Sequence, residues 1–175
     1  MLTGRAATAA VSAGTATAVM PHTFHGGDDP PPAGASSRWW DDPAARDADA
    51  AAVAFAFPGF HLDQRGGGHA WTGTINTGRG RFEVKIVSDP GGGLPAIVPI
   101  LPRALGRNEG RRGFRPAKHL YISGNLCVAD TDDWHPGKHT SATAIAWAAH
   151  WCAAYTDWRL GGPWPTDGYR PRAAA

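Results

Sequence analysis

The sequence predicts an α+β protein in which a small antiparallel sheet packs against helices, and two patterns carry this prediction. In residues 81–87, Phe82, Val84 and Ile86 alternate with charged side chains, which is typical of a half-buried antiparallel strand. Further along the chain, large and small apolar side chains recur at steps of three and four, which predicts a helix with one buried face. These positions are Ala144, Ala148, Trp151, Tyr155 and Trp158.

The other elements follow from start and stop signals along the chain. Asp and Pro residues open a helix predicted from about Pro43 to Ala56, and Pro58 ends it. Residues 70–76 also alternate, and the sequence TGRG that follows them predicts a hairpin turn into 81–87. Residues 96–102 form a third strand whose prolines limit its pairing, and Thr140 or Ser141 caps the last helix. A helix, three meandering strands and a packed helix give the α+β class.

Composition indicates one domain and excludes some kinds of partner. Residues 1–37 contain almost no large apolar side chains, so we expect a disordered segment there and a folded domain at 38–175. A net charge of +2 is too small to indicate nucleic-acid binding, and no run of 18 apolar residues predicts a membrane span. Two cysteines fit a reducing compartment, so we expect a cytoplasmic protein.

Two further patterns permit more than one interpretation. Residues 103–118 form a basic Gly/Arg stretch that we expect to be a solvated loop, or a contact with a partner through Arg111 and Arg112. The tryptophans of the last helix are expected in the core, except that Trp147 lies off the main stripe and is expected to line a groove.

Cys127 lies between the turn-like residues 123–125 and an acidic loop, and three interpretations of it are open. It can be a buried structural thiol, as Cys152 is expected to be. It can be a metal ligand together with His119, His135 and His139, although the irregular spacing argues against this. It can also be a nucleophile, with a nearby histidine as base and an aspartate to orient that base. The candidate bases are His119, His135 and His150.

The stretch HLYISGNLCVADTDDWHP, residues 119–136, carries a resemblance to a known family. It resembles the active-site segment of ubiquitin-conjugating enzymes, with the cysteine at the end of Y..G.LC and a W.P before the next helix. The tail resembles the bacterial branch of that family, which occurs in antiphage operons of the CBASS type and in other ubiquitin-like conjugation operons. The matching residues of the segment are Tyr121, Gly124, Leu126, Cys127, Trp134 and Pro136, and those of the tail are Ile145, Trp147, Trp151, Tyr155, Trp158 and Trp164.

The resemblance implies the ubiquitin-conjugating (UBC-like) fold, a small meander sheet with an N-terminal helix and C-terminal helices against it. It implies a transferase that takes an acyl group as a thioester on Cys127 and passes it to a lysine amine. His119 stands where the family has an asparagine, so two roles are open for it: it can donate a hydrogen bond to the oxyanion, or it can accept a proton. The carboxylates expected to hold or deprotonate the lysine belong to Asp130, Asp132 and Asp133.

The same resemblance implies the partners and leaves two alternatives open. An activating enzyme, a lysine-bearing target and a ubiquitin-like protein or cyclic-nucleotide synthase as acyl donor are the expected partners. No cofactor, metal, nucleic acid or membrane is expected. The alternatives are a binding module of the same fold that does not react, and a cysteine hydrolase that transfers the acyl group to water.

Overall fold

A four-stranded antiparallel sheet forms the centre of the protein. The computed structural model describes residues 8–11, 15–18, 22, 24, 26–34 and 37–164. The strands follow one another in the sheet in chain order, as the predicted meander requires. They are β3 (His61–Asp63), β4 (Ala70–Asn76), β5 (Arg81–Val87) and β6 (Ala96–Leu101). Strand β3 is an addition to the three predicted strands.

The register of the sheet places the predicted apolar positions on one face. Gly73 lies opposite Val84, and Ile75 lies opposite Phe82. A side chain at Gly73 would meet the ring of Phe60 at 2.5 Å, which explains a glycine inside this strand. The proline-bearing β6 pairs with β5 alone among the strands of this sheet, as its composition predicted.

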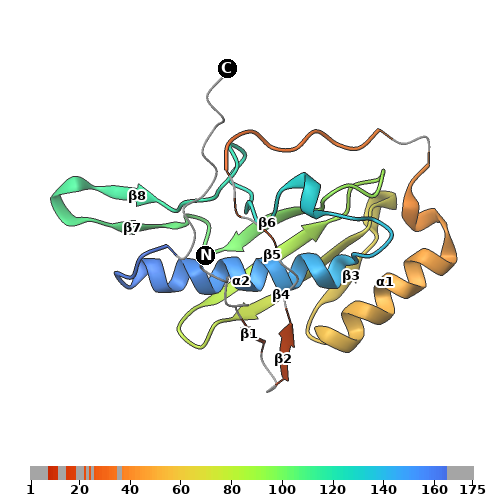
Figure 1. The fold of residues 1–175 in the computed structure, drawn as a ribbon, viewed down its shortest axis with the longest axis horizontal. Helices are drawn as coiled ribbons and strands as arrows, with labels where there is room; N and C mark the ends of the chain where they lie inside the picture. Colours follow the sequence, from red (N-terminus) through yellow and green to blue (C-terminus); the bar gives the residue numbers. More distant parts are fainter. Residues whose placement is uncertain are drawn as a thin grey trace, which may run out of the picture.

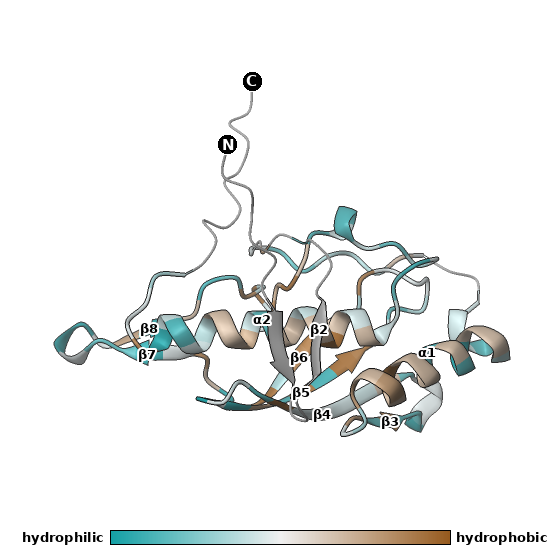
Figure 2. Ribbon diagram, turned by 60° about the horizontal axis from the view of Figure 1, so that its bottom comes forward, coloured by the Kyte–Doolittle hydropathy of each residue, from teal (hydrophilic) through white to brown (hydrophobic). Residues whose placement is uncertain are grey.

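Two helices cover the sheet. Helix α1 (Pro43–Ala56) begins where the Asp42 carboxylate accepts a hydrogen bond from the amide of Ala44, and its bounds are those predicted. Helix α2 (Ser141–Arg159) begins after Thr140, which forms a capping box with Thr143. Figures 1 and 2 show α2 lying across the sheet with α1 at one end of it, so the predicted α+β class is confirmed.

The core lies between α2 and the sheet and continues around the helix. Trp151 and Tyr155 have at most 1% of their surface exposed, and the ring of Tyr155 meets that of Phe82 edge to face. Trp147 is also fully buried and packs against Trp134, so the expectation that it lines a groove is wrong. The reason is that rings from other segments, those of His22, Trp134 and His139, pack against it.

The remaining elements are short. The basic stretch predicted as a loop contains a two-stranded hairpin, β7 (Gly106–Asn108) and β8 (Phe114–Pro116). A second hairpin is formed by β1 (Thr8–Val11) and β2 (Thr15–Ala18). The 3₁₀ helices are η1 (Trp39–Asp41), η2 (Arg65–Gly67), η3 (Gly110–Arg112) and η4 (Thr131–Asp133).

Two expectations concern the chain as a whole. The division into a segment 1–37 and a domain 38–175 remains a prediction, and residues 26–34 of that segment contact the domain through hydrogen bonds. No helix in the described ranges is long and apolar enough to cross a membrane.

Candidate active site

The segment that carries Cys127 is attached to the free edge of β6. The amide of Leu126 donates to the carbonyl oxygen of Ile97 at 2.9 Å, and the amide of Cys127 donates to that of His119 at 3.0 Å. Between these points the chain makes a tight turn at residues 121–125, in which Gly124 adopts a φ of 87°. The sheet edge and this turn therefore fix the backbone that leads into the cysteine.

The sulfur of Cys127 lies in a small polar environment below the surface. Its Sγ is 3.9 Å from the carbonyl oxygen of Ala129, and the Tyr121 hydroxyl donates to the same carbonyl at 3.4 Å. Burial and a hydrogen bond to Cys127 raise the pKa of Tyr121 far above its ordinary value. The phenol is therefore neutral at physiological pH, and its hydroxyl remains a donor beside the sulfur.

Cys127 itself has no exposed surface, although a turn precedes it and an acidic loop follows it. Cys152 is also fully buried, inside α2, and burial raises the pKa of its thiol well above the ordinary value. Sequence position alone predicted the buried state of Cys152 but not that of Cys127.

His119 contributes its backbone to the site, and its ring lies in an aromatic cluster. Its carbonyl oxygen accepts from the amide of Cys127 and from Nε1 of Trp151, both at 3.0 Å. Its imidazole lies 5.7 Å from the ring of Phe24 and 5.1 Å from that of Trp164, measured between centroids. The backbone φ of 56° is sparsely populated by residues other than glycine, so tertiary contacts hold His119 in this conformation.

The three aspartates differ in their hydrogen-bond partners and in their surroundings. Asp130 caps η4, and its carboxylate accepts from the amide of Asp132 at 3.3 Å, while Asp133 accepts from the amide of Asp130. Asp130 lines the same hollow as Tyr121, and its charge helps to raise the pKa of that phenol. Asp132 is exposed on the turn. Of the three predicted carboxylates, Asp130 is the one that the structure brings to the Tyr121–Cys127 pair.

Tyr121 and Asp29 are residues that the sequence did not single out for chemistry. Tyr121 occupies a position of the quoted motif, and this was the available signal for it. Asp29 also contributes to the raised pKa of Tyr121, but it comes from the low-complexity segment, where no pattern indicated a role. Two carboxylates, Asp29 and Asp130, thus lie near one neutral phenol.

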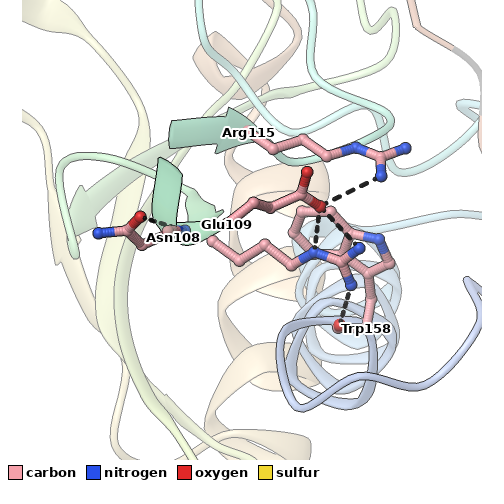
Figure 3. A network of polar contacts seen from close by, with 6 residues as sticks. Asn108, Glu109, Arg115 and Trp158 are labelled. Atoms are coloured by element: carbon pink, nitrogen blue, oxygen red, sulfur yellow. Dashed lines mark hydrogen bonds and ion pairs between the residues drawn. The ribbon is translucent and has the colours of Figure 1, made fainter. Parts of the chain in front are cut away.

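The basic hairpin β7–β8 extends beyond the body of the protein (Figure 1). Arg107 stacks over the ring of Trp158 at 4.6 Å and donates to the carbonyl oxygen of that residue, while Glu109 pairs with Arg107 and Arg115 (Figure 3). Arg111 and Arg112 are exposed in η3 at the tip. A contact between this tip and a partner remains a prediction.

The histidines proposed as metal ligands do not gather around Cys127. The amide of His135 donates to Nδ1 of His139 at 3.1 Å, and burial lowers the pKa of His139. Within the described ranges, no three His, Cys, Asp or Glu side chains are grouped so that they could hold a metal ion.

Comparison with known proteins gives one match. Residues 49–171 match the model of the family described as type II CBASS E2 protein, which covers well over half of the chain. No curated protein and no solved structure matches the chain. The matched range contains the sheet, Cys127, Tyr121, Asp130 and α2. The chain therefore belongs to the family of type II CBASS E2 proteins.

Proposed function

We propose that this protein is a ubiquitin-conjugating-like transferase of bacterial antiphage defence. Cys127 accepts the C-terminal acyl group of a ubiquitin-like protein or cyclic-nucleotide synthase and passes it to a lysine of a target. The observation that carries the proposal is the family match over residues 49–171, because it includes Cys127 on an ordered turn. The remaining partner is an activating enzyme that presents the acyl group as a thioester.

The reaction consists of two acyl transfers. The Cys127 thiolate attacks the carbonyl carbon of the donor thioester, a new C–S bond forms, and the thiolate of the activating enzyme leaves. A lysine amine then attacks the Cys127 thioester, the amine loses a proton, and the Cys127 thiolate leaves as the isopeptide bond forms. The second step is downhill, so the protein mainly needs to position the amine and stabilise the oxyanion.

Residues around the sulfur supply these functions in the proposed mechanism. The neutral Tyr121 hydroxyl, which shares the Ala129 carbonyl oxygen with the sulfur, is the first candidate donor to the reacting centre. Asp130 is the first candidate to hold the incoming lysine, with Asp132 and Asp133 on the same turn. The carbonyl oxygen of His119 orients Cys127 by accepting a hydrogen bond from its amide. The ring of His119 is a second candidate donor.

The test uses cells that carry the tagged protein together with its native neighbouring genes. We expect a band of higher mass on non-reducing gels that thiols remove from wild type and from Cys152→Ala. The band should be absent from Cys127→Ala and resistant to thiols in Cys127→Ser, because an oxygen ester replaces the thioester. Mass spectrometry of the band identifies the acyl donor. If no variant forms an adduct while the partners are shown to be present, the proposal is wrong.

One observation favours a second candidate, a binding module of the same fold that does not react. Cys127 has no exposed surface, and this is typical of a structural thiol in a core. This candidate predicts that Cys127→Ala binds the partner proteins with wild-type affinity and that wild type forms no adduct. A pull-down beside the gel experiment separates the two candidates.

A further inference from the structure

A segment that precedes the domain runs over the turn beside Cys127. We name residues 26–34 the strap. The carbonyl oxygen of Gly27 accepts from the amide of Ile122 at 2.9 Å, and Gly27 and Tyr121 form an isolated parallel bridge. The carboxylate of Asp29 accepts from the amide and hydroxyl of Ser123 and from the side-chain amide of Asn125. The strap therefore holds the 121–125 turn through polar contacts at several points.

Both ends of the strap are anchored elsewhere. Phe24, just before it, has 1% of its surface exposed and packs against His150 and His119. At the far end, the amide of Ala33 donates to Asp89 at 3.1 Å, and the same carboxylate accepts from the amide of Gly93 at 3.0 Å. The strap thus passes from the aromatic cluster beside α2 to the loop between β5 and β6.

The strap faces the groups that cover the sulfur of Cys127. A hollow of about 360 Å³ is lined on one side by residues 26 and 28–31, and on the other by Tyr121 and residues 129–131. Tyr121 and Ala129 are the residues whose polar atoms approach the sulfur. An acyl carbonyl must reach that sulfur, and Cys127 has no exposed surface while the strap is in place.

The contacts of the strap suit reversible attachment. Its sequence, GGDDPPPAG, contains no large apolar side chain, and the three prolines have no amide to donate. It is held by hydrogen bonds at the surface, and each of these contributes a modest net free energy because water competes for both partners. Phe24, by contrast, is a buried apolar anchor that would remain in place when the strap opens.

We propose that the strap is an autoinhibitory device that keeps Tyr121 over Cys127, and that it must leave the 121–125 turn before the sulfur can react. This inference rests on the proposed transferase function, since it concerns access to the acyl acceptor. It implies a closed state, which is the one described above, and an open state in which Cys127 is reachable.

Thiol labelling tests the strap without any partner protein. The purified full-length chain is treated with iodoacetamide at pH 8, and the labelling rate of each cysteine is followed by peptide mass spectrometry. We expect Asp29→Ala to label at Cys127 about tenfold faster than wild type, because it removes the acceptor of three contacts and favours the open state by about 1.4 kcal/mol. Asp28→Ala, which removes the same charge at the neighbouring position, should label at the wild-type rate.

Cys152 distinguishes opening of the strap from unfolding in the same experiment. It is fully buried in α2, so opening of the strap labels Cys127 alone, whereas unfolding labels both cysteines. If Asp29→Ala labels both cysteines, Ser123→Ala is the second variant to test, because it removes one donor to Asp29 and leaves the charges of the protein unchanged. Faster labelling of Cys127 alone in Ser123→Ala supports opening of the strap. Equal rates at Cys127 in Asp29→Ala and Asp28→Ala overturn the inference.

The outcome separates this inference from the proposed function. Failure of the transferase proposal appears as the absence of a thiol-sensitive adduct in cells, whatever the labelling rates. Failure of the strap appears as unchanged labelling, even if the adduct forms. If both hold, Asp29→Ala should also form the Cys127 adduct faster than Asp28→Ala in cells with the native partners.

Discussion

Asp49 is a buried carboxylate that joins three elements, and its removal should destabilise the fold strongly. It lies on α1 with 3% of its surface exposed. Its two oxygens accept from Nε2 of His69 at 3.1 Å, from Nε1 of Trp71 at 3.0 Å and from the amide of Ser141 at 2.6 Å. The contacts connect α1 to β4 and to the first residue of α2.

The size of the effect follows from the donors that would lose their acceptor. Asp49→Ala leaves three buried N–H groups without the carboxylate, and each unsatisfied buried group costs about 1–3 kcal/mol. Hydrogen bonds to a charged acceptor lie at the upper end of such contributions, and effects within one network do not add fully. We therefore expect Asp49→Ala to lower the free energy of unfolding by about 4 kcal/mol.

Urea unfolding followed by circular dichroism at pH 7 measures this loss. Asp49→Asn keeps the volume and one acceptor oxygen, so it should lose about half as much. Asp47→Ala is the matched control on the same helix, because its side chain is 76% exposed and makes only a surface ion pair with Arg46; it should change stability by less than about 0.5 kcal/mol. A loss below about 1 kcal/mol for Asp49→Ala would refute the reasoning.

The carboxylate of Asp49 should also make the stability of the protein depend on pH. Burial alone would raise the pKa of Asp49, but the hydrogen bonds from His69, Ser141 and Trp71 outweigh it, so the pKa lies below the usual range. The stabilisation is therefore complete above the unfolded pKa of about 4 and is lost as the pH falls through the lower folded value. The gap in urea midpoint between wild type and Asp49→Asn should narrow below pH 4, and a constant gap would contradict this assignment.

Three further predictions concern the core and its edges. Tyr155→Phe should lower the free energy of unfolding by about 1–3 kcal/mol in urea, because its buried hydroxyl bonds the amide and the carbonyl of Gly106. Gly73→Ala should cost about 1–3 kcal/mol through overlap with a ring, whereas Gly59→Ala, which meets no atom within 4 Å, should change little in the same melts. Burial lowers the pKa of His150 to about 4, so the stability that its neutral form contributes should fall between pH 6.5 and 4; an NMR titration midpoint near 6.5 would contradict this.

The sequence predicted the elements whose residues repeat with a clear period. Strand β5 was found from strict alternation because one of its faces lies on the core. Helix α1 was found from Asp42 and Pro43 at its start and Pro58 beyond its end. In both cases the local signal and the tertiary environment agree, which is the condition under which a single sequence is informative.

The elements that were missed depend on contacts between distant residues. Strand β3 has three residues, too few to show a period, and it forms by pairing with β4. Strand β7 is Gly-Arg-Asn and strand β8 is Phe-Arg-Pro, and the Gly, Asn and Pro residues among them have low strand propensity. It is held by Tyr155 and Trp158 of α2, some fifty residues later in the chain. No local pattern in residues 103–118 encodes those partners.

The candidate site also combines features that a local motif predicted with features that depend on distant parts of the chain. The motif around Cys127 predicted an acidic turn after the cysteine, and Asp130 of that turn lines the same hollow as Tyr121. The role of Cys127 as a nucleophile remains a prediction. The contacts of the strap with the 121–125 turn were not predicted, because the strap and Phe24 come from a segment whose composition indicated disorder. A single apolar residue in a polar segment gives no periodic signal, yet Phe24 is enough to fix the start of the strap.

The chemistry of the strap also limits how it can be opened. Residues 30–32 are prolines without amide donors, so its polar contacts with the domain concentrate at Gly27, Asp29 and the Asp89 end. A partner can open it only by as much as it binds the open state more tightly than the closed one. Moving such an equilibrium from about 1:99 to 99:1 requires a difference of about 5.5 kcal/mol in binding free energy. Asp29→Ala should raise the population of the open state by the same factor by which it raises the labelling rate of Cys127. If one opening step governs both reactions, the gain in adduct formation and the gain in labelling should agree within about threefold.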